Sequence, residues 1–164
     1  IKVNATKLPL KTKQKTKVLK VTGLAKGDSV AVWKSSNTKV AKVSGSANGT
    51  CIITAGKKTG KATVTVTLKS GLKKKITVTV QKKAVKTTKI TGIAKKTRLK
   101  KGKTLTLKPA VTPLTSLQKV TYKSSNKKVA TVTSKGVIRA RKKGTAVITV
   151  KSGRKTVKCR ITVK

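Results

Sequence analysis

The chain contains two copies of one unit, and this internal repeat constrains its fold more than any other feature of the sequence. Trp33–Val43 recurs as Tyr122–Val132 at a spacing of 89 residues, with Ser-Ser-Asn near the start of each run. Other matches follow in the same order: Ile1 and Leu10 with Ile90 and Leu99, Gly60–Val64 with Gly144–Ile148, and Ser70-Gly71 with Ser152-Gly153. The spacing shrinks only where turn residues intervene, as expected when loops vary and strands do not. The repeat predicts two modules, residues 1–81 and 82–164.

Apolar residues alternate with polar ones at a period of two within each copy. The alternating sets are Ala62, Val64, Val66 and Leu68; Ile76, Val78 and Val80; Ala146, Ile148 and Val150; and Cys159, Ile161 and Val163. Such alternation, rich in β-branched residues, is typical of half-buried antiparallel strands. Turn signals such as Asn48-Gly49 and Ser70-Gly71 separate the strands, and no stretch shows a helical period. The sequence predicts an all-β chain of two sandwich modules of about 80 residues each.

The charge balance excludes most catalytic chemistry. The chain has 44 Lys and Arg residues, no His, and a single acidic residue, Asp28, for a formal net charge of +43. Acid–base catalysis normally needs His, Glu or Asp near its working pKa, and calcium and zinc need clusters of carboxylates, His or Cys. We therefore expect no catalytic residues, no cofactor and no metal site. No apolar run is long enough to span a membrane and no signal peptide opens the chain, so we expect a fragment of a larger protein.

A few residues other than lysine could carry function, and each has a structural interpretation that we favour. Cys51 and Cys159 fall in apolar strands of different copies, so we expect two buried free thiols rather than a disulfide. Trp33 and Tyr122, the only aromatic residues, could stack on bases or sugars, but their equivalent positions favour one core aromatic per module. The two Ser-Ser-Asn segments are expected to satisfy backbone groups of turns.

These motifs resemble the bacterial immunoglobulin-like domains of group two. The resemblance rests on the aromatic position followed by Ser-Ser-Asn, on the Val-Ala-x-Val run in both copies, and on the closing Ile-Thr-Val strand. Lys108–Pro113 in the second copy also fits, whereas the first copy has Gly23–Asp28 in its place. The resemblance implies two tandem immunoglobulin-like β-sandwich domains, used outside the cell as spacer, stalk or adhesion module. It implies no particular ligand site.

Lysines without counter-charges are the remaining candidates for function. Residues 1–81 hold 18 Lys and one Asp, a net +17, and residues 84–164 hold 19 Lys and five Arg, a net +24. Self-repulsion of this size destabilises a free domain, and a polyanionic setting would relieve it. The runs of lysine that we expect to contact polyanions are Lys57, Lys58, Lys73, Lys74, Lys75, Lys95, Lys96, Lys100, Lys101, Lys142 and Lys143.

Three functions stay open. The favoured hypothesis is a basic segment of a bacterial surface or cell-wall protein that attaches to anionic polymers, such as teichoic acid or anionic glycans, by charge. A purely mechanical spacer is the second. Non-specific nucleic-acid binding is the third; specific recognition is disfavoured because five Arg against 39 Lys, and two aromatics expected in the cores, do not suit base readout.

Overall fold

The computed structural model describes residues 1–164 and consists of 17 strands joined by turns and loops, with no helix. It therefore contains no apolar helix that could cross a bilayer. The residues form two compact units, Ile1–Val85 with Pro113–Ser116, and Lys86–Thr112 with Leu117–Lys164. Below, strands β1–β8 are called the first module and strands β9–β17 the second module. The prediction of an all-β chain is confirmed.

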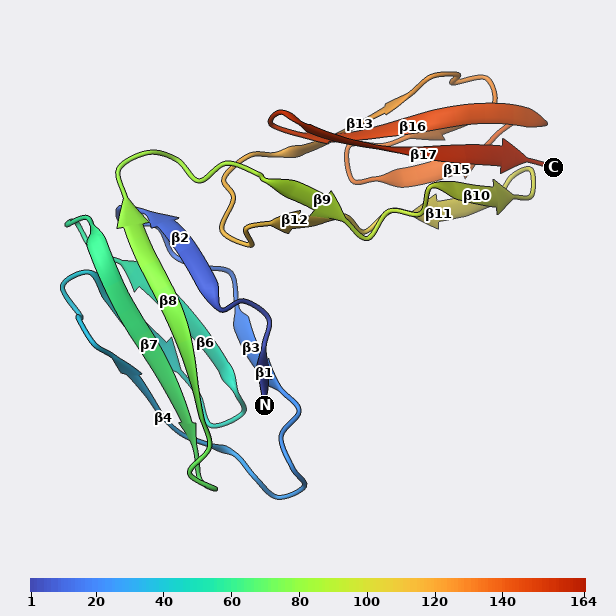
Figure 1. The fold of residues 1–164 in the computed structure, drawn as a ribbon. Coiled ribbons are helices and arrows are strands. Elements are labelled where there is room, and N and C mark those ends of the chain that lie inside the picture. The colour runs from blue at the N-terminus through green and yellow to red at the C-terminus, as the bar shows by residue number, and fades with distance from the viewer. The chain divides into compact units, whose positions relative to one another are not determined.

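The first module is a sandwich of two four-stranded sheets (Figure 1). One sheet has the strand order β1 (Lys2–Val3), β3 (Leu19–Thr22), β6 (Thr50–Ala55) and β5 (Ala41–Gly45). The other has the order β2 (Lys7–Lys11), β8 (Lys73–Gln81), β7 (Gly60–Leu68) and β4 (Val30–Ser35). Neighbouring strands are antiparallel, except that β2 pairs parallel to the last strand, β8.

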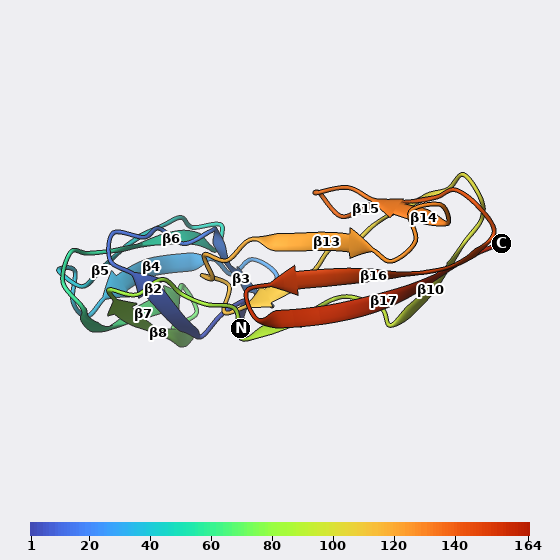
Figure 2. The ribbon, with the colours of Figure 1, turned by 90° about the horizontal axis from the view of Figure 1, so that it is seen from above.

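The second module repeats this plan with one sheet divided. Its larger sheet has the order β10 (Lys96–Leu99), β17 (Lys155–Val163), β16 (Gly144–Ser152) and β13 (Val120–Ser124). These strands lie side by side in Figure 2, and β10 is again parallel to the last strand. The remaining strands form two smaller sheets, β11 (Thr104–Thr106)–β15 (Val137–Ala140)–β14 (Ala130–Val132) and β12 (Ala110–Thr112)–β9 (Lys89–Thr91).

A proline explains the division. In the first module the single strand β3 pairs with both β1 and β6. In the second module β11 pairs with β15 and β12 pairs with β9, and Pro109 lies between β11 and β12. Proline has no backbone N–H and cannot donate to a ladder, so it interrupts a strand at this point.

The residues that the alternation predicted to face inward form the interiors of the two modules. Every residue of the four alternating sets is buried, and strands of both sheets contribute to each core. Cys51 belongs to the first core and Cys159 to the second; both are buried and unpaired, as predicted. Burial raises the pKa of the Cys51 thiol to about 12.

The two aromatic rings pack against their cores, as predicted, but neither is fully buried. Trp33 lies on β4 and Tyr122 on β13, which are edge strands of their sheets, so each ring has a strand on one side only. Trp33 lies over Gly45, where a Cβ would collide with the indole, and its Nε1 donates to the Ser46 carbonyl at 3.4 Å. Tyr122 lies over Gly136, where a Cβ would come within 2.8 Å of the ring.

Candidate functional site

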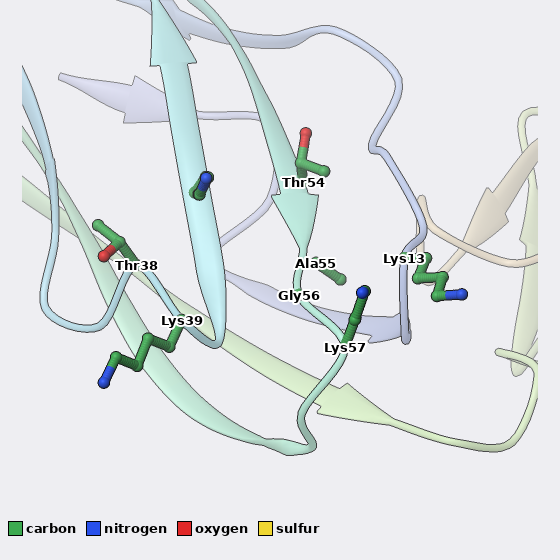
Figure 3. Close-up of a pocket in the computed structure, with 8 residues that line it drawn as sticks. Lys13, Thr38, Lys39, Thr54, Ala55, Gly56 and Lys57 are labelled. Atoms are coloured by element: carbon green, nitrogen blue, oxygen red, sulfur yellow. The ribbon is translucent and has the colours of Figure 1, made fainter.

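One end of the first module carries a hollow lined by four lysines. It has a volume of about 350 Å³ and its lining residues are Lys13, Thr38, Lys39, Lys42, Thr54, Ala55, Gly56 and Lys57. We call it the first hollow. In Figure 3, Lys57 and Lys13 lie on one side of the backbone at Ala55 and Gly56, and the Lys39 side chain extends outward on the other side. All four lysines are exposed, so their flexible side chains can turn toward a ligand.

The turn after β2 brings Lys13 to this hollow. The Thr12 N–H donates to the Gln81 carbonyl at 2.9 Å, and the Lys13 N–H donates to the Gly56 carbonyl at 3.0 Å. Lys13 has φ of 64°, and it is the one residue other than glycine with a positive φ in the chain. The left-handed region is unfavourable for a residue with a Cβ. The turn is thus fixed by hydrogen bonds around a strained lysine.

The first Ser-Ser-Asn segment positions the opposite rim. Asn37 Oδ1 accepts from the backbone N–H groups of Lys39 and Val40 at 3.1 and 3.3 Å, and Ser35 Oγ donates to the Ala41 carbonyl at 2.7 Å. These bonds confirm that the segment satisfies a turn. Gly56 closes the wall, because a Cβ there would collide with the Lys39 carbonyl oxygen.

The second module has a hollow at the equivalent place. Its volume is about 400 Å³ and its lining residues are Lys101, Gly102, Arg139, Ala140 and Arg141. We call it the second hollow. The backbone bonds correspond to those of the first: Ala140 N–H donates to the Lys103 carbonyl at 2.9 Å, as Ala55 N–H donates to the Gln14 carbonyl at 2.8 Å. Arg141 Nε donates to Thr131 Oγ1 at 3.4 Å, which orients its guanidinium.

The strained position of the first hollow has an unstrained equivalent in the second. Gly102 stands 89 residues after Lys13 and has φ of 82°. The fold therefore requires a left-handed residue at this turn in both modules. The second module supplies glycine, which adopts that conformation without steric cost, whereas the first supplies a cation.

No acidic side chain lines either hollow. The single acidic side chain, Asp28, is engaged elsewhere: it accepts from Ser70 Oγ at 2.6 Å, from the Ser70 N–H at 3.3 Å and from the Ser29 N–H at 2.9 Å. The hydrogen bond from the Ser70 side chain is the main cause that lowers the pKa of Asp28. The cations of the hollows thus have no carboxylate side chain to neutralise them, and their chemistry suits binding of an anionic group.

The predicted lysines divide between the hollows and the rest of the surface. Lys57 lines the first hollow and Lys101 the second, while Lys96 lines a third concave region on the outer face of β10 and β17 with Arg98 and Arg160. Lys73, Lys74 and Lys75 lie at the start of β8, at the other end of the sheet from the first hollow. The remaining predicted residues, Lys58, Lys95, Lys100, Lys142 and Lys143, are exposed in loops and turns.

Five cations of the hollows were not among the predicted residues. They are Lys13, Lys39, Lys42, Arg139 and Arg141, none of which belongs to a run of lysines. Only folding brings Lys13, Lys39 and Lys42 together, because the turn after β2 and the Ser-Ser-Asn turn lie far apart in the sequence; Arg139 and Arg141, by contrast, stand beside the predicted Lys142. The match of Lys13 with Gly102 at the repeat spacing was the one sequence signal that could have indicated the first hollow.

The arrangement of strands defines the class of this protein. Each module has sheets packed face to face around buried apolar side chains, and its second strand runs parallel to its last strand, which is the arrangement of an immunoglobulin-like β-sandwich. The family model for the bacterial Ig-like domain (group 2) matches residues 1–80 and again residues 84–163. The chain belongs to this family, as a tandem pair of its domains.

Several solved structures are similar to the chain. Domains 5–6 of the S-layer protein SbsC are 21% identical, with 100% of this chain and 97% of that chain covered and a TM-score of 0.48. The S-layer protein fragment rSbsC(31-844) is 26% identical, with 80% and 19% covered and a TM-score of 0.45. A C-terminal fragment of intimin, solved with the intimin-binding domain of its translocated receptor, is 20% identical, with 98% and 62% covered and a TM-score of 0.35. The chain thus spans about a fifth of the rSbsC fragment. No curated protein is significantly similar in sequence.

Proposed function

We propose that this chain is a non-catalytic segment of a larger bacterial surface protein and attaches to anionic polymers by charge. The observation that carries the proposal is a net charge of +43 distributed over both modules, with one acidic side chain in the whole chain. A fold used only as a spacer needs no such imbalance, because mixed charges keep a surface soluble without strong self-repulsion. Teichoic acid and anionic glycans are the polymers that fit a cell-surface setting.

Membership of the bacterial Ig-like family supports the surface placement, and the residue inventory supports a binding rather than a catalytic role. No group of three or more His, Cys, Asp or Glu side chains lies together. The first hollow offers ammonium groups with threonine hydroxyls, and the second offers an ammonium group with two guanidinium groups; both sets are suited to holding anions.

Binding measured across a salt series tests the proposal. Teichoic acid, heparin and DNA are compared at equal charge density, with a neutral peptidoglycan fraction as control. We expect tight binding at low salt, a linear fall of log K with log salt, and no binding to the neutral fraction. If none of the polymers binds at 0.05 M salt, the spacer function is correct instead. If only DNA binds, the nucleic-acid alternative replaces this proposal.

A further inference from the structure

We propose that the first hollow is a discrete site for one phosphate-bearing unit of an anionic polymer, namely a phosphate group with the polyol attached to it. This inference rests on the proposed function and adds a location and a chemistry to it. It concerns four lysines, only one of which belongs to a run of lysines in the sequence.

The strained turn is the first argument for a built site. Lys13 keeps a left-handed backbone at a position where the other module has glycine, so the first module tolerates a steric cost that a glycine would remove. A backbone outlier at a concave cationic surface is a reason to look for a function there. The strained turn brings a fourth ammonium group, that of Lys13, to the rim opposite Lys39 and Lys42.

The recurrence of the hollow is the second argument. The second hollow lies at the equivalent turn and carries three cations, although the residues differ: Arg139 and Arg141 stand where the first module has Thr54 and Gly56. Positive charge is thus present at this end of both modules, but four lysines carry it in the first module and one lysine and two arginines carry it in the second.

The lining indicates the occupant. Ammonium groups are compact point charges that bind phosphate oxygens from many directions, without the planar fork by which a guanidinium holds a carboxylate or a phosphate. All the cations of the first hollow are lysines. Its volume of about 350 Å³ exceeds the space of a phosphate alone, which leaves room for a short polyol. The hydroxyl groups of Thr38 and Thr54 in the lining can exchange hydrogen bonds with polyol hydroxyls.

Two variants of equal charge separate a site from a diffuse field. The hollow variant carries Lys39→Gln, Lys42→Gln and Lys57→Gln. The control variant carries Lys69→Gln, Lys73→Gln and Lys75→Gln, which are exposed residues at the other end of β7 and β8. Both lose three charges from the first module. The full 164-residue chain is titrated with glycerol phosphate, glucuronate and a phosphodiester dinucleotide at 0.15 M salt, and amide shifts report binding and folding together.

We expect glycerol phosphate to shift amides of the first hollow, with affinity reduced at least tenfold in the hollow variant and less than twofold in the control variant. We expect Lys13→Gly to weaken binding as well while leaving the rest of the spectrum unchanged. Equal losses in the two triple variants, or no glycerol phosphate binding by the unmodified chain, would overturn the site. If the polymers of the salt series still bind in those cases, the proposed function stands without the site. If they do not bind, both the site and the proposed function are wrong. Tighter binding of glucuronate or of the dinucleotide would overturn the polyol phosphate assignment.

Discussion

The two modules share an arrangement of strands but place different residues at the same left-handed turn. After its second strand, the first module places Lys13 in a left-handed conformation, and the second module places Gly102 there. The first module also carries the only acidic side chain, a single β3 strand and an aromatic that contacts two core clusters, whereas the second has no acid, a strand divided by Pro109 and one core cluster. The comparison shows that alternation preserves strand pairing and core in both modules, while the loops and the residues that carry positive charge at the hollows differ between them.

The largest difference should appear when each aromatic is removed. Trp33 packs against both core clusters of the first module, and Tyr122 packs against one. We expect Trp33→Ala to lower the free energy of unfolding of the first module by about 3 kcal/mol, the low end for a tryptophan because the ring is only partly buried, and Tyr122→Ala to cost the second module about 2 kcal/mol.

The two cysteines report the modules separately. Cys51 and Cys159 are buried in different cores, so each thiol reacts with an alkylating reagent only when its module opens; the raised pKa of Cys51, about 12, slows its reaction further. Alkylation followed by mass spectrometry should show Cys51 labelled roughly a hundredfold faster in Trp33→Ala, with Cys159 unchanged. Equal acceleration of both thiols would mean that the modules do not unfold independently.

The next largest effect concerns the glycine beneath the indole. Gly45 leaves no room for a Cβ against Trp33, so Gly45→Ala should displace the ring and cost about 2 kcal/mol. Ser134 stands 89 residues later and is exposed, so Ser134→Ala should be nearly neutral. Trp33 fluorescence and chemical denaturation measure both variants. A neutral Gly45→Ala would contradict the packing described for this ring.

Exchanging the turn residues Lys13 and Gly102 should change the free energies of unfolding of the two modules in opposite directions. Lys13→Gly removes a left-handed lysine and should raise the free energy of unfolding of the first module by about 0.5–1 kcal/mol, since relief of strain outweighs the added chain entropy. Gly102→Lys should lower that of the second module by about 1 kcal/mol. Differential scanning calorimetry of the two variants tests the pair. Destabilisation by Lys13→Gly would show that Lys13 is retained for the fold rather than for binding.

The buried strands and the Ser-Ser-Asn turns could be predicted from the sequence, whereas the exposure of Trp33 and the first hollow could not. Alternation placed Val64 and Ile148 in their cores, because period two leaves one face per strand, and the Ser-Ser-Asn turns follow from local hydrogen bonding. The incomplete burial of Trp33 could not be predicted, because it depends on β4 being an edge strand. The first hollow could not be predicted either, because it forms where three distant turns meet. The domain boundaries and the polymer ligand stay predictions.

The smallest expected effect is a pH dependence confined to the first module. Hydrogen bonds from Ser70 lower the pKa of Asp28 below its ordinary value, so the ionised carboxylate stabilises the folded module above that value. This contribution should be lost as the pH falls through the lowered pKa. Thiol labelling between pH 5 and pH 2 is too slow, so amide exchange is the measurement. Asp28→Asn should abolish the dependence, and the second module, with no acidic side chain, should show none. An equal acid response in both modules would contradict the role given to Asp28.

A map of polymer contacts on the isotope-labelled chain tests the central claim most directly. The chain is titrated at 0.15 M salt with a short glycerol phosphate oligomer, a condition in which charges beyond about 8 Å are screened. The account predicts that amide shifts concentrate at the first hollow around Lys13, Lys39, Lys42 and Gly56, with a weaker set around Arg139 and Arg141. Shifts spread evenly over all lysine-bearing strands, or their absence at both hollows, would contradict it.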